Sequence, residues 1–210
     1  MSKVPKLDLK KEYREFYNPS AKECVVVDVP DMHFLMVDGS GDPNTSQDYQ
    51  DAVGALYGLA YTLKFHSKIV LEIDYTVMPL EGLWWADEMT EFPGEDKSAW
   101  KWTAMIMQPD HITAADVEAA REDVRNKKDP PALDLLRLES LYEGPSVQIM
   151  HIGPYADEAP TIARLHQFAT GGGYRLRGRH HEIYRSDPRR AAPEKLRTVI
   201  RQPVEPATHQ

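Results

Sequence analysis

The first half of the chain alternates short apolar runs with turn-forming segments. Two runs rich in β-branched and apolar residues, at 24–29 and 34–37, flank Pro30, and a loop rich in Gly, Asp and Pro follows. This pattern predicts a strand, a kink, a second strand and a loop. Apolar residues then recur at helical spacing over about 45–65, after a capping-box pattern at Thr45. One amphipathic helix is therefore expected there.

Two further strand patterns and a helical insert follow. Residues 71–77 alternate apolar with polar positions, which is typical of a strand with one buried face, and Pro79 is expected to end it. A strand-like run covers 100–108. The insert, at about 113–142, opens with a capping-box pattern, and after a Pro-Pro pair a second helix is predicted at about 132–142.

The last third of the chain repeats the element order of the first half. We expect a strand, a helix and two strands, at about 147–152, 157–169, 180–184 and 196–202. The order indicates two divergent copies of one motif, at about 24–108 and 147–203. Residues 1–20, which mix charges, prolines and aromatics, are expected to form an irregular surface strap, and residues 21–210 a single domain containing both copies.

Composition excludes several classes of function. Lys and Arg total 25 against 33 Asp and Glu, a formal net charge of -8, which would repel nucleic acid. Cys24 is the only cysteine, so no disulfide forms within the chain and no cysteine-based zinc site can be assembled. No run approaches the roughly 20 apolar residues of a membrane span, and no signal-peptide core begins the chain. These features predict a cytoplasmic protein without a membrane or nucleic-acid partner.

Several motifs that suggest chemistry have plainer explanations. His180 and His181 are neighbours on a predicted strand, so their side chains point to opposite faces and cannot both bind one metal ion. The Gly-rich segment 171–173 follows a helix and precedes a strand, the reverse of a phosphate-binding loop, so a helix cap explains it. Six arginines between 175 and 190 read as a solvated face rather than an anion site. No metal and no cofactor is predicted.

Aromatic side chains and one polar strand are the features that remain. Trp84 and Trp85 are adjacent, so in an extended segment at least one of them is expected to line a cleft or to lie exposed. Alternation places His180, Glu182 and Tyr184 on one face of their strand. Both faces of that strand carry charged or imidazole side chains, which favours a carboxylate that faces a cavity.

Four segments resemble the GyrI-like small-molecule-binding proteins. They are Phe34-Leu-Met-Val-Asp-Gly-Ser-Gly-Asp-Pro43, Leu80-Glu-Gly-Leu-Trp-Trp85, Val147-Gln-Ile-Met-His-Ile-Gly-Pro-Tyr155 and His181-Glu-Ile-Tyr-Arg-Ser-Asp-Pro188. The resemblance implies an α+β fold of two strand-helix-strand-strand modules related by pseudo-two-fold symmetry, whose antiparallel sheets form a ligand cleft. In relatives fused to DNA-binding domains the module senses lipophilic cationic drugs, and the acidic residue that matches Glu182 lies in the cleft.

The resemblance also implies a ligand and a reaction. The Leu-Glu-Gly-Leu-Trp-Trp segment is similar to a stand-alone subgroup linked to hydrolysis of cyclopropane-bearing indole genotoxins. On that reading Glu182 is the general base that activates water, and Tyr155 is the hydrogen-bond donor. Aromatic walls would hold the flat substrate, and the candidates are Trp85, Trp102, Tyr184, Tyr75, Tyr142, Tyr61 and Phe34.

Three functions remain open from the sequence. The chain is an enzyme that opens a strained electrophile, a module that sequesters flat aromatic or cationic molecules, or a gyrase-binding inhibitor. Its partner is a small molecule in the first two cases. The oligomeric state is open as well, with a homodimer among the alternatives.

Overall fold

The computed structural model describes residues 6–86 and 97–207 of the chain. Two compact units share these residues, and each is built from separate stretches of sequence. The first unit comprises Met1–Glu12, Met32–Leu80 and Asp96–Leu141, and the second comprises Tyr13–Asp31, Glu81–Glu95 and Tyr142–Gln210. The long strands β2 and β6 each contribute residues to both units.

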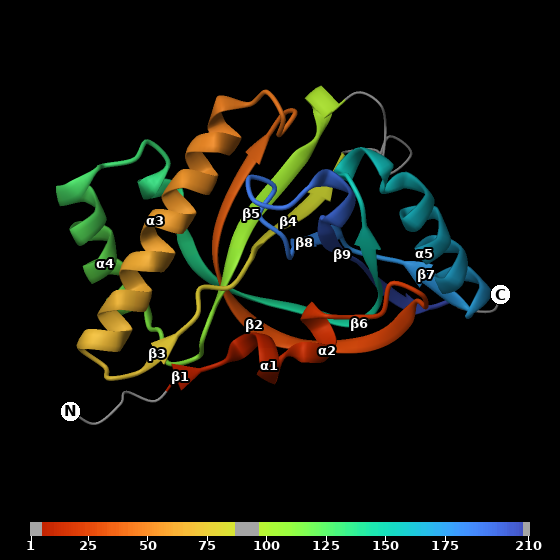
Figure 1. Ribbon diagram of the computed structural model, residues 1–210, viewed down its shortest axis with the longest axis horizontal. Coiled ribbons are helices and arrows are strands. Elements are labelled where there is room, and N and C mark those ends of the chain that lie inside the picture. Colours follow the sequence, from red (N-terminus) through yellow and green to blue (C-terminus); the bar gives the residue numbers. More distant parts are fainter. Residues whose placement is uncertain (1–5, 87–96, 208–210) are drawn as a thin grey trace. The chain divides into compact units, whose positions relative to one another are not determined.

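The first unit combines helices with an antiparallel strand pair. β2 pairs with β5 from His33 opposite Gln108 to Ser40 opposite Lys101. The long helix α3 lies between α4 and β5 (Figure 1). The elements of this unit are β1 (Lys6–Leu7), α1 (Leu9–Glu12), part of β2 (Val25–Ser40), α3 (Gln47–Ile69), β3 (Asp74–Tyr75), η2 (Lys97–Ala99), β5 (Lys101–Gln108), α4 (Ala114–Lys127), η3 (Leu133–Leu135) and the start of β6 (Arg137–Ile152).

Capping residues set where the two helices of the first unit begin. The Ser46 hydroxyl accepts a hydrogen bond from the backbone N–H of Tyr49, so the N-cap of α3 lies one residue after the expected Thr45. Thr113 and Asp116 form the capping box expected at the start of α4. The inner face of α3 is fully buried, and its apolar residues there are Ala52, Ala55, Leu56, Leu59, Ala60 and Leu63.

The second unit is an antiparallel sheet covered by one helix. β9 lies between β8 and β6, and β4 pairs with the other edge of β8. The helix α5 packs on β7 and β9 (Figure 1). Besides its shares of β2 and β6, this unit holds α2 (Arg14–Tyr17), β4 (Leu80–Trp85), η4 (Tyr155–Asp157), α5 (Ala159–Gly171), β7 (Tyr174–Leu176), β8 (His180–Tyr184), η5 (Pro193–Lys195) and β9 (Arg197–Pro206).

An apolar cluster holds α5 against this sheet. Leu165 and Ala169 on the helix meet Val147 and Ile149 of β6 and Ile200 of β9, and all five are at most 1% exposed. The spacing of four residues between the helical members places them on one face of α5. This packing holds α5 on β6 and β9 within the unit.

The α+β class and the antiparallel pairing are confirmed, and so is the order of elements. The sequence β2, α3, β4, β5 in the first half recurs as β6, α5, β8, β9 in the second. The compact units nevertheless differ from these sequential halves. Because β4 pairs with β8, a strand of the first half belongs to the second unit.

Four local expectations were wrong. The second insert helix is a single 3-10 turn, and the chain is already extended from Arg137, where it enters β6. Only Asp74 and Tyr75 of the alternating segment 71–77 form a strand, because Glu72 has a φ of 57° that interrupts extended backbone. β2 also runs through Pro30 without ending.

The fourth concerns the N-terminal strap. It contains the short helices α1 and α2, and Tyr17 within it is 1% exposed. The segment therefore contributes to the core.

Candidate functional site

Strand β8 presents two different chemical faces. His180 lies opposite Trp84 of β4, and Glu182 lies opposite Gly82, so these side-chain positions share one face of the sheet. His181 lies opposite Arg201 of β9 on the other face. The alternation expected from the sequence therefore separates the two histidines.

The front face gathers donors around the Glu182 carboxylate, whose side chain is 13% exposed. The Tyr184 hydroxyl donates to Oε2 at 2.8 Å, and Nε2 of His180 lies 3.2 Å from Oε1. Glu158, the N-cap residue of α5, also hydrogen-bonds to this carboxylate. The indole N–H of Trp84 donates to the Tyr184 oxygen at 3.1 Å. A largely buried carboxylate thus accepts hydrogen bonds from several elements of one unit.

These contacts decide the protonation of Glu182. Burial raises the pKa of its carboxyl group, but the hydrogen bonds from His180, Tyr184 and Glu158 together outweigh burial and hold the pKa below its usual value. Glu182 is ionised at neutral pH, which is the form that a general base requires.

Tyr155 lies beside this cluster. It begins η4, directly after the Gly-Pro turn, and is 39% exposed. Its ring meets the ring of Tyr184 edge-on, with centroids 5.5 Å apart. The structure thus brings Tyr155, Tyr184 and Glu182 together within the second unit.

Trp84, rather than Trp85, shares the face of Glu182. A Cβ atom on Gly82 would lie only 2.7 Å from Nε1 of Trp84, so the glycine leaves the space that this indole fills. Trp85 points to the opposite face. The guanidinium of Arg179 covers its ring at 3.7 Å from the centroid, a cation–π contact.

The back face of β8 holds a buried ionic network. His181 places Nε2 3.0 Å from a Glu81 oxygen and Nδ1 3.0 Å from Glu143. Tyr17 donates to Glu81 at 2.6 Å, and Arg201 pairs with Glu143 at 2.7 Å. All five residues are buried, so two anions and two cations compensate each other once His181 is protonated.

Three predicted ligand-binding aromatics are core residues of the first unit. Trp102 is 1% exposed and meets the ring of Tyr49 edge-on at 5.0 Å. Tyr75 is equally buried and donates to Gln108 at 3.2 Å, while Phe34 is buried too. Their place in the core explains them without a ligand.

Two other predicted aromatics are exposed. Tyr61 lies on α3, where it stacks against Tyr57 with centroids 6.3 Å apart. Tyr142, in β6, is 62% exposed and lies against Gly144. Their roles in ligand binding stay predictions.

Known proteins share both this sequence pattern and this fold. The family profile described as the GyrI-like small molecule binding domain matches residues 22–205. The chain belongs to the GyrI-like family. Among curated proteins none matches it significantly.

Similar solved structures extend the comparison. An uncharacterised conserved protein from Listeria innocua is 42% identical, with a TM-score of 0.88 over 95% of this chain and 100% of its own. A protein described as a hydrolase, also from Listeria innocua, is 41% identical, with a TM-score of 0.83 over 95% and 100% of the two chains. The C-terminal domain of EcmrR, 12% identical over 88% and 98%, has a TM-score of 0.54 and shows the fold alone.

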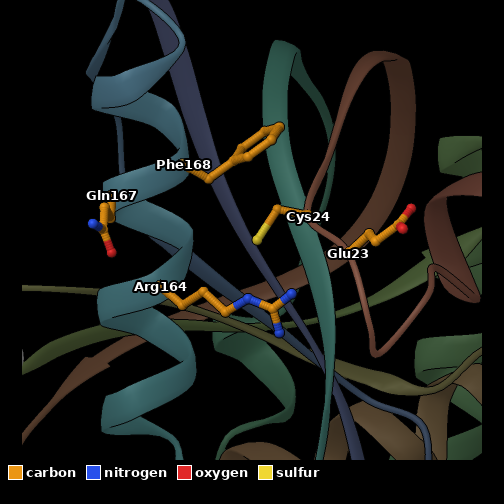
Figure 2. A pocket seen from close by; sticks show the side chains of 5 residues that line it. All are labelled: Glu23, Cys24, Arg164, Gln167 and Phe168. Carbon is orange, nitrogen blue, oxygen red and sulfur yellow. The ribbon is translucent and has the colours of Figure 1, made fainter.

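A separate cavity of about 480 Å³ opens in the second unit of this GyrI-like chain. Figure 2 shows the Cys24 sulfur directed toward α5, near Phe168 and Arg164, while Glu23 points away. Burial raises the pKa of the Cys24 thiol more than the charge of Arg164 lowers it, so the thiol is a weak nucleophile. This lining shares no residue with the cluster around Glu182.

Residues 6–86 and 97–207 hold neither a metal-binding cluster nor a membrane-spanning helix. No group of three or more His, Cys, Asp or Glu side chains there is placed to hold a metal ion. No helix in the described part of the chain is long and apolar enough to cross a membrane.

Sequence reasoning missed three parts of this site. It did not single out Glu158 or the partners of His181, and of the two adjacent tryptophans it chose Trp85 rather than Trp84 as a ligand-binding residue. One signal was present: Glu81 interrupts the otherwise apolar run Leu80–Trp85, and a carboxylate in such a run indicates a buried partner. The pairing of Glu158 with Glu182 has no such signal, because it depends on how α5 packs.

Proposed function

We propose that this chain hydrolyses a strained cyclopropane activated by a conjugated carbonyl, of the kind carried by indole genotoxins, and so protects the cell. Membership of a small-molecule-binding family supports the binding step. The relative from Listeria innocua described as a hydrolase, 41% identical over its whole length, favours catalysis. The observation that carries the proposal is the largely buried carboxylate of Glu182, which accepts a hydrogen bond from Tyr184 with Tyr155 beside it.

The reaction needs only a base, a donor and a shaped surface. Water attacks the strained ring carbon while Glu182 removes a proton from that water. A carbon–oxygen bond forms, a ring carbon–carbon bond breaks, and its electron pair moves to the carbonyl oxygen. A hydrogen-bond donor at that oxygen stabilises the negative charge as it develops.

The structure favours Tyr155 over Tyr184 as this donor. The Tyr184 oxygen accepts the indole N–H of Trp84, so its own proton is directed at Glu182. Tyr155 lies beside it and is 39% exposed, so a ligand can reach its side chain. Proposed roles are therefore base for Glu182, oxyanion donor for Tyr155, and orientation of the base for Tyr184.

The test compares variants on a spirocyclopropane-indole compound, with the ring-opened product followed by mass spectrometry. Glu182→Gln keeps the shape and removes the base, so turnover should fall by about 100- to 10,000-fold while the uncharged compound still binds. Tyr155→Phe should cost less. Glu205→Gln, which removes a carboxylate paired with Arg175 at the surface, should leave turnover unchanged.

Two outcomes would change the proposal. Full turnover in Glu182→Gln would remove the base assignment. A wild-type protein that binds the compound without producing the ring-opened product would leave sequestration of flat molecules as the function.

A further inference from the structure

Two carboxyl groups of the second unit meet inside the protein. Glu158, at the start of α5, is 5% exposed, and the side chain of Glu182 on β8 is 13% exposed. The two side chains hydrogen-bond to each other. Tyr155, which precedes Glu158 by three residues, packs on Tyr184 of β8. The turn η4 and the start of α5 are therefore held against β8.

A hydrogen bond between two carboxyl groups requires a proton. Two carboxylates close enough to share a hydrogen bond repel each other strongly, and little water is present to screen them. The pair therefore does not ionise completely near neutral pH. One proton therefore belongs to the pair.

The other contacts of Glu182 show which oxygen acts as acceptor. An indole N–H can only donate, so the Tyr184 oxygen accepts the hydrogen bond from Trp84. The Tyr184 proton is therefore directed to Oε2 of Glu182. Nε2 of His180 faces Oε1. With donors on both oxygens, Glu182 is the ionised member, and Glu158 is left to carry the proton.

We propose that Glu158 stays protonated at neutral pH and donates its proton to the hydrogen bond with Glu182, which makes Glu158 a positioning residue for the base. This inference rests on the proposed function for its catalytic meaning. The shared proton keeps Glu182 ionised and fixes the direction of its carboxylate. Glu158 itself does not touch the reacting atoms.

The Glu158–Glu182 pair holds the same number of protons before and after one turnover. Glu182 takes a proton from the attacking water, so the pair then holds two protons. The ring-opened product is left with a negative oxygen. Glu182 returns its proton to that oxygen directly or through solvent, and the pair is again left with one.

Other titratable groups surround the pair and contribute to any pH profile. His180 and Tyr184 lie beside Glu182 on β8, and Tyr155 lies on η4. Burial and the charge of His180 both lower the pKa of His166 on α5. A readout specific to carboxyl groups is therefore needed.

Carbon-13 NMR of protein labelled at the glutamate carboxyl carbon supplies that readout. At pH 7 the wild type should show one resonance with the shift of a protonated carboxyl group. Glu158→Gln should remove it. Glu12→Gln, at an exposed position, should leave it in place.

The inference is overturned if the wild type shows no protonated carboxyl resonance, or if that resonance survives in Glu158→Gln. This measurement needs no substrate. A protein that shows the resonance but fails to open the cyclopropane therefore refutes the proposed function and leaves the shared proton established.

The pH dependence of turnover separates positioning from a merely structural role. Glu158→Ala removes a hydrogen bond to a charged group, so the acid limb should move to higher pH, by about a 10- to 100-fold change in the acid dissociation constant. Glu158→Gln restores a donor and should restore the acid limb. Equal profiles for wild type and Glu158→Ala would show that Glu158 does not act on the base.

Discussion

Individual contacts around Glu182 make its carboxylate a weaker base and fix its orientation. Each donor that lowers the pKa of this carboxyl group makes it a weaker base, yet keeps it ionised and aimed at one position. The proton of Tyr184 is directed by Trp84, and the position of Trp84 depends on the missing side chain at Gly82. The base therefore depends on residues that make no contact with it.

Gly82→Ala tests this chain of contacts. The new Cβ would lie 2.7 Å from Nε1 of Trp84, so the indole must shift and its hydrogen bond to Tyr184 should break. A base misplaced by about 1 Å typically loses up to about 100-fold in rate, so turnover should fall by about 10- to 100-fold. Gly54→Ala, on α3 with open space around the added Cβ, is the control. Unchanged turnover in Gly82→Ala would show that the indole position is unimportant.

Trp85 supports a second prediction at this scale. The Arg179 guanidinium occupies its ring face, so a flat cation must displace this arginine in order to stack there. Cation–π contacts at exposed sites contribute about 0.5–1 kcal/mol, so Arg179→Ala should raise the affinity of a rhodamine dye by about 2- to 5-fold. Tryptophan fluorescence quenching measures this. Arg175→Ala removes the same charge from another, exposed position, and an equal effect in both variants would mean that Trp85 is not the stacking surface.

At the scale of elements, β8 joins a reactive face to a structural one. Its back is fixed by charges that are buried together, and its front carries the cluster around Glu182. Removing one member of such a buried network leaves an uncompensated charge, whereas a surface pair contributes little.

Glu143→Gln tests the structural role of the back face. The substitution leaves Arg201 and His181 without their shared anion, so the free energy of unfolding should fall by about 3–5 kcal/mol. Glu205→Gln breaks a partly exposed pair in the same unit and should cost at most about 1 kcal/mol. Urea denaturation measures both. Similar midpoints for the two variants would contradict the assignment.

Sequence patterns predicted a helix or strand well where the spacing of its own apolar and polar residues determines the structure. The strand 180–184 was predicted with its observed bounds, and the helix at 45–65 corresponds to α3. The segment 132–142 was predicted helical, but pairing with other strands makes it extended from Arg137. The contact of Glu158 with Glu182 could not be predicted, because no local pattern determines which turn packs on which strand.

For the whole molecule, two buried groups contribute opposite pH dependences to stability. Burial alone would raise the pKa of Glu143, but His181 and Arg201 lower it from 4.5 to about 2. Burial alone would lower the pKa of His181, but Glu143 and Glu81 raise it above 6.5. The ionised glutamate and the protonated histidine are thus both favoured in the folded state.

These shifts predict opposite losses of stability at the two ends of the pH scale. The contribution of Glu143 is complete above about pH 4.5 and is lost as the pH falls toward 2. The contribution of His181 is complete below its unfolded pKa of about 6.5 and is lost as the pH rises through its higher folded value. Urea midpoints measured across this range should peak between about pH 4.5 and 6.5. In His181→Gln the alkaline decline should be smaller, and a decline equal to that of the wild type would assign it to another group.

The two faces of β8 also determine how the family can diverge. A charge on the back face cannot change alone, because its partners would be left buried without compensation, so positions 81, 143, 181 and 201 should change together or not at all. Positions 180 and 184 on the front are less restricted, because Glu182 keeps other hydrogen-bond donors when one of them changes. Natural variants that accept new ligands should therefore differ first on the front, over a back that is inherited unchanged.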